Sequence, residues 1–400
     1  MKVDTQLSQN KLSVADLIAS NQVPVLNAEN QLWLEGKDLT SLEGLDQISN
    51  VNIVTVLDLA GNKITHLNAT TFQGLEQLEF IDLSGNPLVA IDPETFKGLK
   101  QLKTLTIDFP TLKVIDPGIF KGLNQLEHLY FTIKKLTRLS PVLFRGLVKL
   151  NTLRLECDVK SIHPDTFKDL TQIKTLMITG TRLTHIDPVI FKGLNQLQLL
   201  HVCGNQLTHI DSTLFKEIPQ LESFCCEDNQ LSSIDPKTFQ GLSKIQQISL
   251  KNNKLSTIDP VVFQRLKQLW SLDLVENSLT TLDPATFKRL RQLRVLTLDN
   301  NQLTSIDPVL FHDLIQLRYL NLGRNALINI DQGAFKRLNR LKYLSLNQNK
   351  LTNIDPSTFV ELTRLKSLNL DENQLTSENK VAIKQALPKK VKIDFEESDI

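Results

Sequence analysis

One group of side chains in the sequence has the residue types that could do chemistry: His201, Cys203, Cys225 and Glu227. Imidazole nitrogens and thiolate sulfurs are ligands that zinc prefers, and a carboxylate can complete the set. A histidine beside a cysteine can also activate the thiolate as a nucleophile. Three interpretations stay open for this group: a metal site, a catalytic site, or ordinary surface residues, of which the sequence favours the last.

An internal repeat must position these side chains. One apolar position recurs with a spacing of 24 residues and one step of 23, and it is occupied by Val54, Leu78, Leu102, Leu126, Leu150, Ile173, Leu197, Leu221, Ile245, Leu269, Leu293, Leu317, Leu341 and Leu365. Each is followed by the alternation L-x-L, which predicts a short strand with every second side chain outward. His201 and Cys225 then take one outward position on adjacent strands. Cys203 and Glu227 lie two residues further along.

The repeat beginning at Leu293 reads L-x-x-L-x-L-x-x-N-x-L. This pattern resembles the leucine-rich-repeat family, in its typical 24-residue class. The resemblance implies an α/β solenoid with a curved parallel sheet on the concave face and short helical or irregular segments on the convex face. It predicts an N-terminal capping helix and irregular first repeat over 1–53, an array of 14 repeats over 54–376, and a C-terminal cap over 377–400 with a helix, an edge strand and an acidic tail.

The convex side is marked by Asp-Pro pairs such as Asp307-Pro308 and by a recurring phenylalanine. Proline stops the strand, and the aspartate can cap a short helical segment. Thirteen of the eighteen phenylalanines share one position and should stack as a spine: Phe72, Phe96, Phe120, Phe144, Phe167, Phe191, Phe215, Phe239, Phe263, Phe287, Phe311, Phe335 and Phe359.

Both ends of the array need covers, because an open solenoid exposes its core and an unpaired strand edge. We expect a helix over Ser13–Ser20 with Ser13 as its cap, and a second helix from Glu378 to Leu387 that Pro388 ends. After it, Val391 to Phe395 alternates as a final strand.

An asparagine recurs where its amide can satisfy the backbone of the turn: Asn62, Asn86, Asn205, Asn229, Asn253, Asn277, Asn301, Asn325, Asn349 and Asn373. Four consecutive repeats instead have Pro110, Lys134, the shortened stretch Cys157-Asp158, and Thr181. The geometry of this rim should therefore change there. Neutral drift and a site shaped for a partner both account for the change.

The charge balance excludes a general attraction to nucleic acid or anionic membranes. Lysine and arginine number 45 and aspartate and glutamate 44, for a net charge of +1, so a charged partner must be met locally. Basic residues do recur along one edge near the C-terminus: Lys288, Arg289, Arg291, Arg294, Lys336, Arg337, Arg340, Lys342, Arg364 and Lys366. They are either solvated surface or a site for an acidic protein or a phosphate-bearing partner.

No signature of a phosphate, dinucleotide, hydrolase or zinc site occurs in the sequence, and an open sheet offers no water-excluded cleft. We expect no enzyme, cofactor or metal. The first ten residues lack the apolar core of a secretory signal. The four cysteines lie inside the array, whereas extracellular proteins of the family usually have disulfide-clamped caps. The predicted location is the cytoplasm, or the host cytosol after translocation.

The main interface is predicted on the concave face, where outward positions carry large amphipathic or apolar groups. These are His128, Tyr130, Arg154, Met177, Leu199 and His201. Phe109 and Ile133 would extend this patch along the rim, and Trp270, Tyr319 and Tyr343 form a sparser second cluster. Aromatic residues and arginine are the usual energetic anchors of interfaces. The sequence therefore predicts a non-catalytic module that binds a partner protein and is monomeric when free.

The repeat type also resembles leucine-rich-repeat effectors that intracellular bacteria such as Legionella deliver into host cells. The tail Asp394–Ile400 is similar to the glutamate-bearing C-terminal signals of type IV secretion substrates. This resemblance implies an effector that acts on a host protein. The alternatives are a structural spacer, and an enzyme or metal site at His201, Cys203, Cys225 and Glu227.

Overall fold

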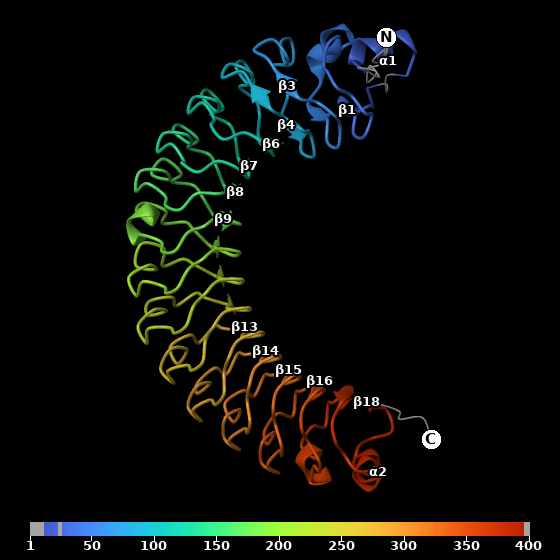
Figure 1. The fold of residues 1–400 in the computed structure, drawn as a ribbon, viewed down its shortest axis with the longest axis vertical. Coiled ribbons are helices and arrows are strands. Elements are labelled where there is room, and N and C mark those ends of the chain that lie inside the picture. Colours follow the sequence, from blue (N-terminus) through green and yellow to red (C-terminus); the bar gives the residue numbers. More distant parts are fainter. Residues whose placement is uncertain (1–11, 23–25, 396–400) are drawn as a thin grey trace, which may run out of the picture. The chain divides into compact units, whose positions relative to one another are not determined.

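The computed structural model describes residues 12–22 and 26–395. The chain divides into two compact units, which are described separately. The N-terminal unit comprises Met1–Arg182 and Val189–Leu197, and the C-terminal unit comprises Leu183–Pro188 and Gln198–Ile400. In each unit the strands lie on the inner side of successive turns of chain, and irregular segments lie on the outer side (Figure 1). Each unit is thus a parallel-sheet solenoid, as the repeat predicts.

The described part of the N-terminal unit has seven parallel strands in its main sheet. They are Gln31–Trp33 (β1), Val56–Asp58 (β2), Phe80–Leu83 (β4), Thr104–Asp108 (β6), His128–Ile133 (β7), Thr152–Cys157 (β8) and Thr175–Thr179 (β9). On the outer side, His66–Leu67 (β3) pairs with Ala90–Ile91 (β5). Residues at equivalent repeat positions face each other across neighbouring strands, so each position forms a row across the sheet.

The C-terminal unit continues this plan with nine parallel strands among its described residues. They are Leu199–His201 (β10), Ser223–Cys225 (β11), Gln247–Ser249 (β12), Ser271–Asp273 (β13), Val295–Thr297 (β14), Tyr319–Asn321 (β15), Tyr343–Ser345 (β16), Ser367–Asn369 (β17) and Lys392–Asp394 (β18). Their central residues, such as Leu296 and Leu320, point into the core and are fully buried.

The outer segments are mostly irregular turns with a few short helices, as predicted, because a stretch of four or five residues is too short to propagate a longer helix. Short 3-10 helices occur at Leu45–Gln47 (η1), Val51–Ile53 (η2), Pro188–Phe191 (η3) and Pro356–Phe359 (η4). The aspartate of the Asp-Pro pair caps the turn as expected: Asp307 accepts a hydrogen bond from the backbone amide of Val309 at 2.9 Å.

The recurring phenylalanines stack inside both units, which confirms the predicted spine. In the N-terminal unit the ring centroids of Phe120 and Phe144 lie 6.4 Å apart with 9° between planes. In the C-terminal unit Phe287 and Phe311 lie 6.3 Å apart with 11° between planes. Full burial of each ring contributes roughly 1.5–3 kcal/mol to the free energy of unfolding. A ring is buried only when the neighbouring repeat covers it, so this contribution depends on that repeat.

The asparagine ladder ties each turn to the one before it. The side-chain amide of Asn253 donates to the carbonyl oxygens of Leu250 at 3.1 Å and of Cys226, in the preceding repeat, at 2.9 Å. Its Oδ1 accepts from the backbone amide of Leu231 at 3.0 Å. One buried amide therefore satisfies backbone groups of two repeats that would otherwise be left unpaired.

The repeats without the asparagine have longer strands, so the predicted change of rim geometry is present. Strands β6 to β9 contain five or six residues, whereas β10 to β17 contain three each. The residue just before the asparagine is left-handed in the regular repeats, for example Asn252 at φ 49° and Gln348 at φ 50°. In the longer repeats the equivalent residues are Ile133 and Cys157, which end β7 and β8, and Phe109, which directly follows β6. All three are buried.

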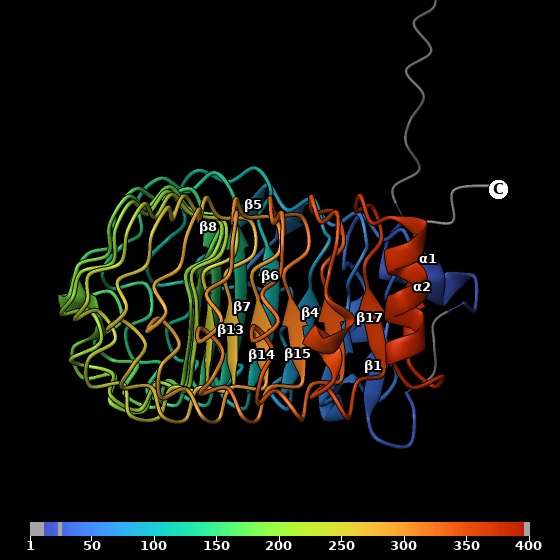
Figure 2. The ribbon, with the colours of Figure 1, turned by 90° about the horizontal axis from the view of Figure 1, so that it is seen from below.

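A helix lies near each described end of the chain. Helix α1 (Val14–Ala19) begins at Ser13, whose hydroxyl accepts from the Asp16 amide while the Asp16 carboxylate accepts from the Ser13 amide. Helix α2 (Ser377–Ala386) lies at the end of the C-terminal unit in both views (Figures 1 and 2). Buried Asn379 on α2 donates to the Ile354 carbonyl at 2.8 Å and accepts from its amide at 3.0 Å, which fixes α2 beside η4.

Candidate functional surface

Three outward side chains of the predicted patch lie in one row on the sheet of the N-terminal unit. Tyr130 on β7 is opposite Arg154 on β8, and Arg154 is opposite Met177 on β9. The exposed fraction of Tyr130 is 36%, Arg154 is exposed, and Met177 is half-buried. Neighbouring strands lie about 4.8 Å apart, so the three side chains adjoin. The structure therefore brings an aromatic ring, a guanidinium and a thioether together on one open face.

A shallow open hollow of about 480 Å³ adjoins Tyr130 and Arg154. Its other walls are Thr106, Asp108, Thr132, Lys134 and Glu156. Across it, the Lys134 ammonium and the Glu156 carboxylate are 3.5 Å apart. The hollow thus presents both signs of charge next to the aromatic ring.

The sequence reasoning did not single out Asp108, Thr132 and Glu156 as surface residues of this region. They form a further outward row because β6, β7 and β8 run past the point at which regular repeats turn. The signal for this row was present in the sequence. It is the absence of the asparagine at the Pro110 and Lys134 positions.

His128 lies at the first residue of β7, two positions before Tyr130. Its ring is half-buried, and its Nδ1 has no hydrogen-bond partner among the described residues. A buried ring nitrogen without a partner is costly.

Phe109 and Ile133 do not extend the patch, and the prediction that placed them there is wrong. Both side chains are fully buried, and Phe109 packs edge-on against Phe131 with 6.1 Å between ring centroids. The reason is the strand period of two: because β7 continues unbroken, Ile133 points inward with Phe131. A β-branched or bulky residue also resists the left-handed conformation that would turn the chain at this position.

Leu199 and His201 belong to the C-terminal unit, on strand β10, and both are half-buried. In the same unit Tyr319 and Tyr343 face each other on β15 and β16, with ring centroids 6.3 Å apart. Trp270 precedes β13, and its indole N–H donates to Gln246 Oε1 at 3.4 Å. The second aromatic cluster is therefore an exposed feature of this unit, with 44% of Tyr343 accessible.

The possible metal or catalytic group is only partly brought together. His201 is opposite Cys225 on β11, and the thiol groups of Cys225 and Cys203 share a hydrogen bond. The carboxylate of Glu227 instead accepts from the Ser249 hydroxyl at 2.6 Å. Among residues 12–22 and 26–395, no group of three or more histidine, cysteine, aspartate or glutamate side chains is placed to hold a metal ion.

The pKa shifts of His201 and Cys225 disfavour a thiolate–imidazolium pair between them. Burial lowers the pKa of His201, which disfavours the protonated ring. The hydrogen bond with Cys203, together with burial, raises the pKa of Cys225, while the same bond lowers the pKa of Cys203. Cys226 and Cys157 are buried core residues as expected, and burial raises the pKa of Cys157 to about 12.

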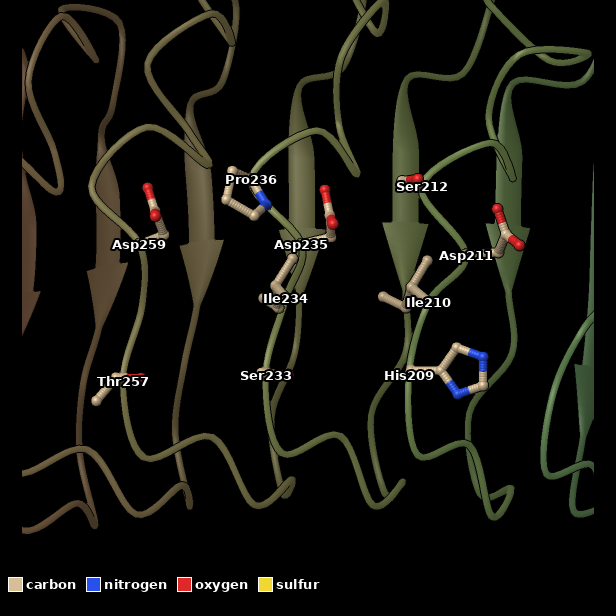
Figure 3. Close-up of a pocket in the computed structure, with 10 residues that line it drawn as sticks. All are labelled: His209, Ile210, Asp211, Ser212, Ser233, Ile234, Asp235, Pro236, Thr257 and Asp259. Atoms are coloured by element: carbon tan, nitrogen blue, oxygen red, sulfur yellow. The ribbon is translucent and has the colours of Figure 1, made fainter.

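A hollow of about 570 Å³ on the outer side of the C-terminal unit is lined by equivalent residues of successive repeats (Figure 3). Asp211, Asp235 and Asp259 point the same way there. Each carboxylate already accepts a hydrogen bond from the backbone amide two residues later, at 2.7, 2.7 and 2.9 Å. These aspartates therefore act as caps of the turns that line the hollow.

Within the described residues, the helices are too short and too polar to span a membrane.

Comparison with solved structures supports this fold. A chain of the Drosophila Toll–Spatzle complex is 18% identical with a TM-score of 0.69, over 82% of this chain and 47% of that chain. A leucine-rich-repeat protein of Leptospira interrogans is 20% identical with a TM-score of 0.64, over 96% of this chain and 100% of that chain. An internalin of Listeria monocytogenes is 23% identical with a TM-score of 0.61, over 78% of this chain and 85% of that chain. These identities establish similarity of fold alone.

No curated protein matches the sequence significantly. The family described as Leucine rich repeat does match, in overlapping segments at residues 37–88, 53–109, 86–131, 100–159, 156–207, 171–225, 226–279, 271–327 and 316–375. Members of this family generally bind other proteins and do not catalyse reactions. With its repeats matched over most of its length, the chain belongs to the leucine-rich-repeat family.

Proposed function

We propose that this protein captures a partner protein on the strand face of its N-terminal unit, at the row formed by Tyr130, Arg154 and Met177. The observation that carries the proposal is the exposure of a tyrosine and an arginine on adjacent strands, beside an open hollow with both signs of charge. Tyrosine and arginine are enriched among the residues that dominate binding energy. An exposed apolar and aromatic row has no benefit to an isolated protein in water.

The mode of binding follows from the flat geometry of the row. The Tyr130 ring supplies apolar area with little loss of side-chain entropy, and Arg154 can bind a carboxylate of the partner with two parallel hydrogen bonds. Lys134 and Glu156 at the hollow select the partner by charge, because a like charge brought against either one is unfavourable. A face this open suits a protein surface better than a small molecule.

The decisive variant is the double substitution Tyr130→Ala and Arg154→Ala. A partner is first isolated by cross-linked pull-down from host-cell lysate, and its affinity is then measured by calorimetry. The double variant should weaken the free energy of binding by about 4 kcal/mol, since the loss of a single anchor residue can weaken it by 2 kcal/mol or more. The melting temperature should not change, because both side chains are outside the core.

The matched control is Tyr319→Ala with Tyr343→Ala, which removes two exposed aromatic rings from the C-terminal unit. It should leave the affinity within a factor of two of the parent. Unchanged affinity in the first double variant together with lost affinity in the control would move the interface to the C-terminal unit.

We further propose that the partner is a host protein and that a bacterium delivers this chain into the host cytosol. The support is the resemblance of the repeat type to bacterial effectors and the acidic tail, of which Glu396–Ile400 lie outside the described residues. Removing Glu396 to Ile400 should abolish delivery in a translocation reporter assay and leave the circular dichroism spectrum unchanged. Full delivery by the truncated chain would refute the role of the tail.

A further inference from the structure

One edge of the C-terminal unit carries an excess of positive charge. The segments 264–270, 288–294, 312–318, 336–342 and 360–366, which lead into strands β13 to β17, contain thirteen lysines and arginines but only two carboxylates. Twelve of the thirteen basic side chains are exposed, and Lys342 is half-buried. We call these five segments the basic edge.

The basic residues are aligned along this edge in a regular row. The backbone amide of Arg318 donates to the carbonyl of Arg294 at 2.8 Å, and those of Lys342 and Lys366 continue the series at 2.9 and 2.8 Å. Four cations therefore occupy one repeat position on four successive strands. With about 4.8 Å between strands, they repel one another unless a counter-charge lies along the row.

The carboxylates of the protein do not supply this counter-charge. Within the described part of the chain, no ion pair joins any of the thirteen basic side chains to a carboxylate. The two carboxylates of the basic edge are used by the backbone: Asp313 accepts from the Arg289 amide at 2.7 Å, and Glu361 from the Arg337 amide at 2.8 Å. The row is thus left with its charge uncompensated.

The same repeat position in the N-terminal unit is different. There Lys103 pairs with Glu79 at 2.8 Å, and Glu127 occupies the next strand. The five equivalent segments 73–79, 97–103, 121–127, 145–151 and 168–174 together contain eight basic and four acidic residues. The unpaired row is therefore not a general property of the repeat. It is a local feature of β14 to β17.

We propose that the basic edge binds a short acidic segment of a protein, in an extended conformation along the row of Arg294, Arg318, Lys342 and Lys366. The whole basic edge runs along five strands and spans about 19 Å, which matches about six residues of extended peptide, and the row of four cations takes up about 14 Å of that length. Tyr319 and Tyr343 lie one position along from Arg318 and Lys342, and 37% of Ile315 is exposed. These side chains offer apolar contacts that suit a polypeptide with mixed side chains.

The opposite rim of the same strands favours a narrow peptide over a broad polyanion. Segments 273–277, 297–301, 321–325, 345–349 and 369–373 contain five acidic residues and one arginine, Arg324, which is paired with Asp299. A polyanion wide enough to reach along the strands from the basic edge, such as duplex nucleic acid, would meet this negative rim. A peptide of about six residues fits on the basic edge alone.

The probe for this proposal is a fluorescein-labelled hexaglutamate peptide, with its hexaglutamine counterpart as the uncharged control. Its affinity is measured by fluorescence anisotropy at two salt concentrations. The triple variant Arg294→Glu, Arg318→Glu and Lys342→Glu should weaken binding by more than about tenfold, and added salt should weaken binding to the parent protein.

The matched variant Lys97→Glu, Lys100→Glu and Lys121→Glu makes the same charge change in the N-terminal unit and should bind within about twofold of the parent. An equal loss in both triple variants, no preference for glutamate over glutamine, or tighter binding of single-stranded DNA or a heparin hexasaccharide would overturn the proposal. If the first triple variant melts early, substitution of the same three residues by glutamine gives the same test. Binding of hexaglutamate by the Tyr130→Ala, Arg154→Ala variant should equal that of the parent, which separates this surface from the one proposed above.

Discussion

Strands β7 and β8 of the N-terminal unit end differently from the strands of the C-terminal unit. In the C-terminal unit, β12 to β17 stop after three residues, and a left-handed residue followed by asparagine turns the chain. In the N-terminal unit, β7 and β8 continue for six residues, and the side chains at the left-handed position, Ile133 and Cys157, are extended and buried instead. The residue at the left-handed position and the residue that follows it therefore decide where the strand ends.

The comparison teaches that the turn needs both the asparagine and a residue that tolerates the left-handed conformation. Left-handed backbone costs roughly 1–2 kcal/mol for residues other than glycine, and more for β-branched residues. Gln348 adopts it at φ 50° because the adjacent Asn349 supplies hydrogen bonds to two repeats. Ile133 is followed by Lys134 and has no such compensation. The extended strand then gains one outward row, which builds the hollow beside Tyr130.

The largest effect should follow from Phe109→Ala. This ring is fully buried, so its removal should lower the free energy of unfolding by up to about 5 kcal/mol through a cavity. Phe239→Ala in the regular repeats of the C-terminal unit should cost a similar amount, about 3–5 kcal/mol. Urea unfolding measures both. If Phe109→Ala instead unfolds at the same urea concentration as the parent but no longer binds the partner, then Phe109 belongs to the interface and not to the core.

The left-handed position gives the next largest contrast. Replacing Ile133 by glycine should lower the free energy of unfolding by about 4 kcal/mol. The substitution removes a buried side chain and adds backbone freedom that is lost when the strand forms. Replacing Gln348 by glycine should change stability by no more than about 0.5 kcal/mol, because glycine removes the strain at φ 50°. Calorimetric melting of the two variants measures the difference. Equal losses at the two positions would contradict the explanation offered for the long strands.

A smaller effect is expected from Asn277→Ala. Asn277 donates to the carbonyls of Leu250 and Leu274 at 3.0 and 3.2 Å and accepts from the Leu255 amide at 3.1 Å, so its loss should cost about 3 kcal/mol. Lys134→Ala, at the same repeat position of the N-terminal unit, should cost less than about 0.5 kcal/mol because that side chain is exposed. Chemical denaturation of the two variants measures both losses in the free energy of unfolding. A large loss for Lys134→Ala would show that the exposed lysine has replaced the asparagine as a structural tie.

Most of the fold could be predicted from the sequence, because the 24-residue repeat imposes one strand, one capped turn and one inward phenylalanine each time. Ser13 as the cap of α1 and the end of α2 before Pro388 followed from local rules alone. Much of the candidate surface also followed, since Tyr130 and Arg154 occupy a regular outward position. Phe109 and Ile133 were misplaced, because reading them as rim residues assumed that every repeat turns at the same point.

The sequence by itself determined the family, the repeat period, the inward rows and the row of cations before β14 to β17, because each of these depends on residues at fixed spacing. Only the tertiary structure decided where β6 to β8 end, which carboxylates are already used as caps, and that the Glu227 carboxylate bonds to Ser249. These outcomes depend on contacts between neighbouring repeats, where a residue's partner lies more than twenty positions away. Spacing along the chain places side chains in rows, but the competition among those contacts decides which groups remain available to a partner.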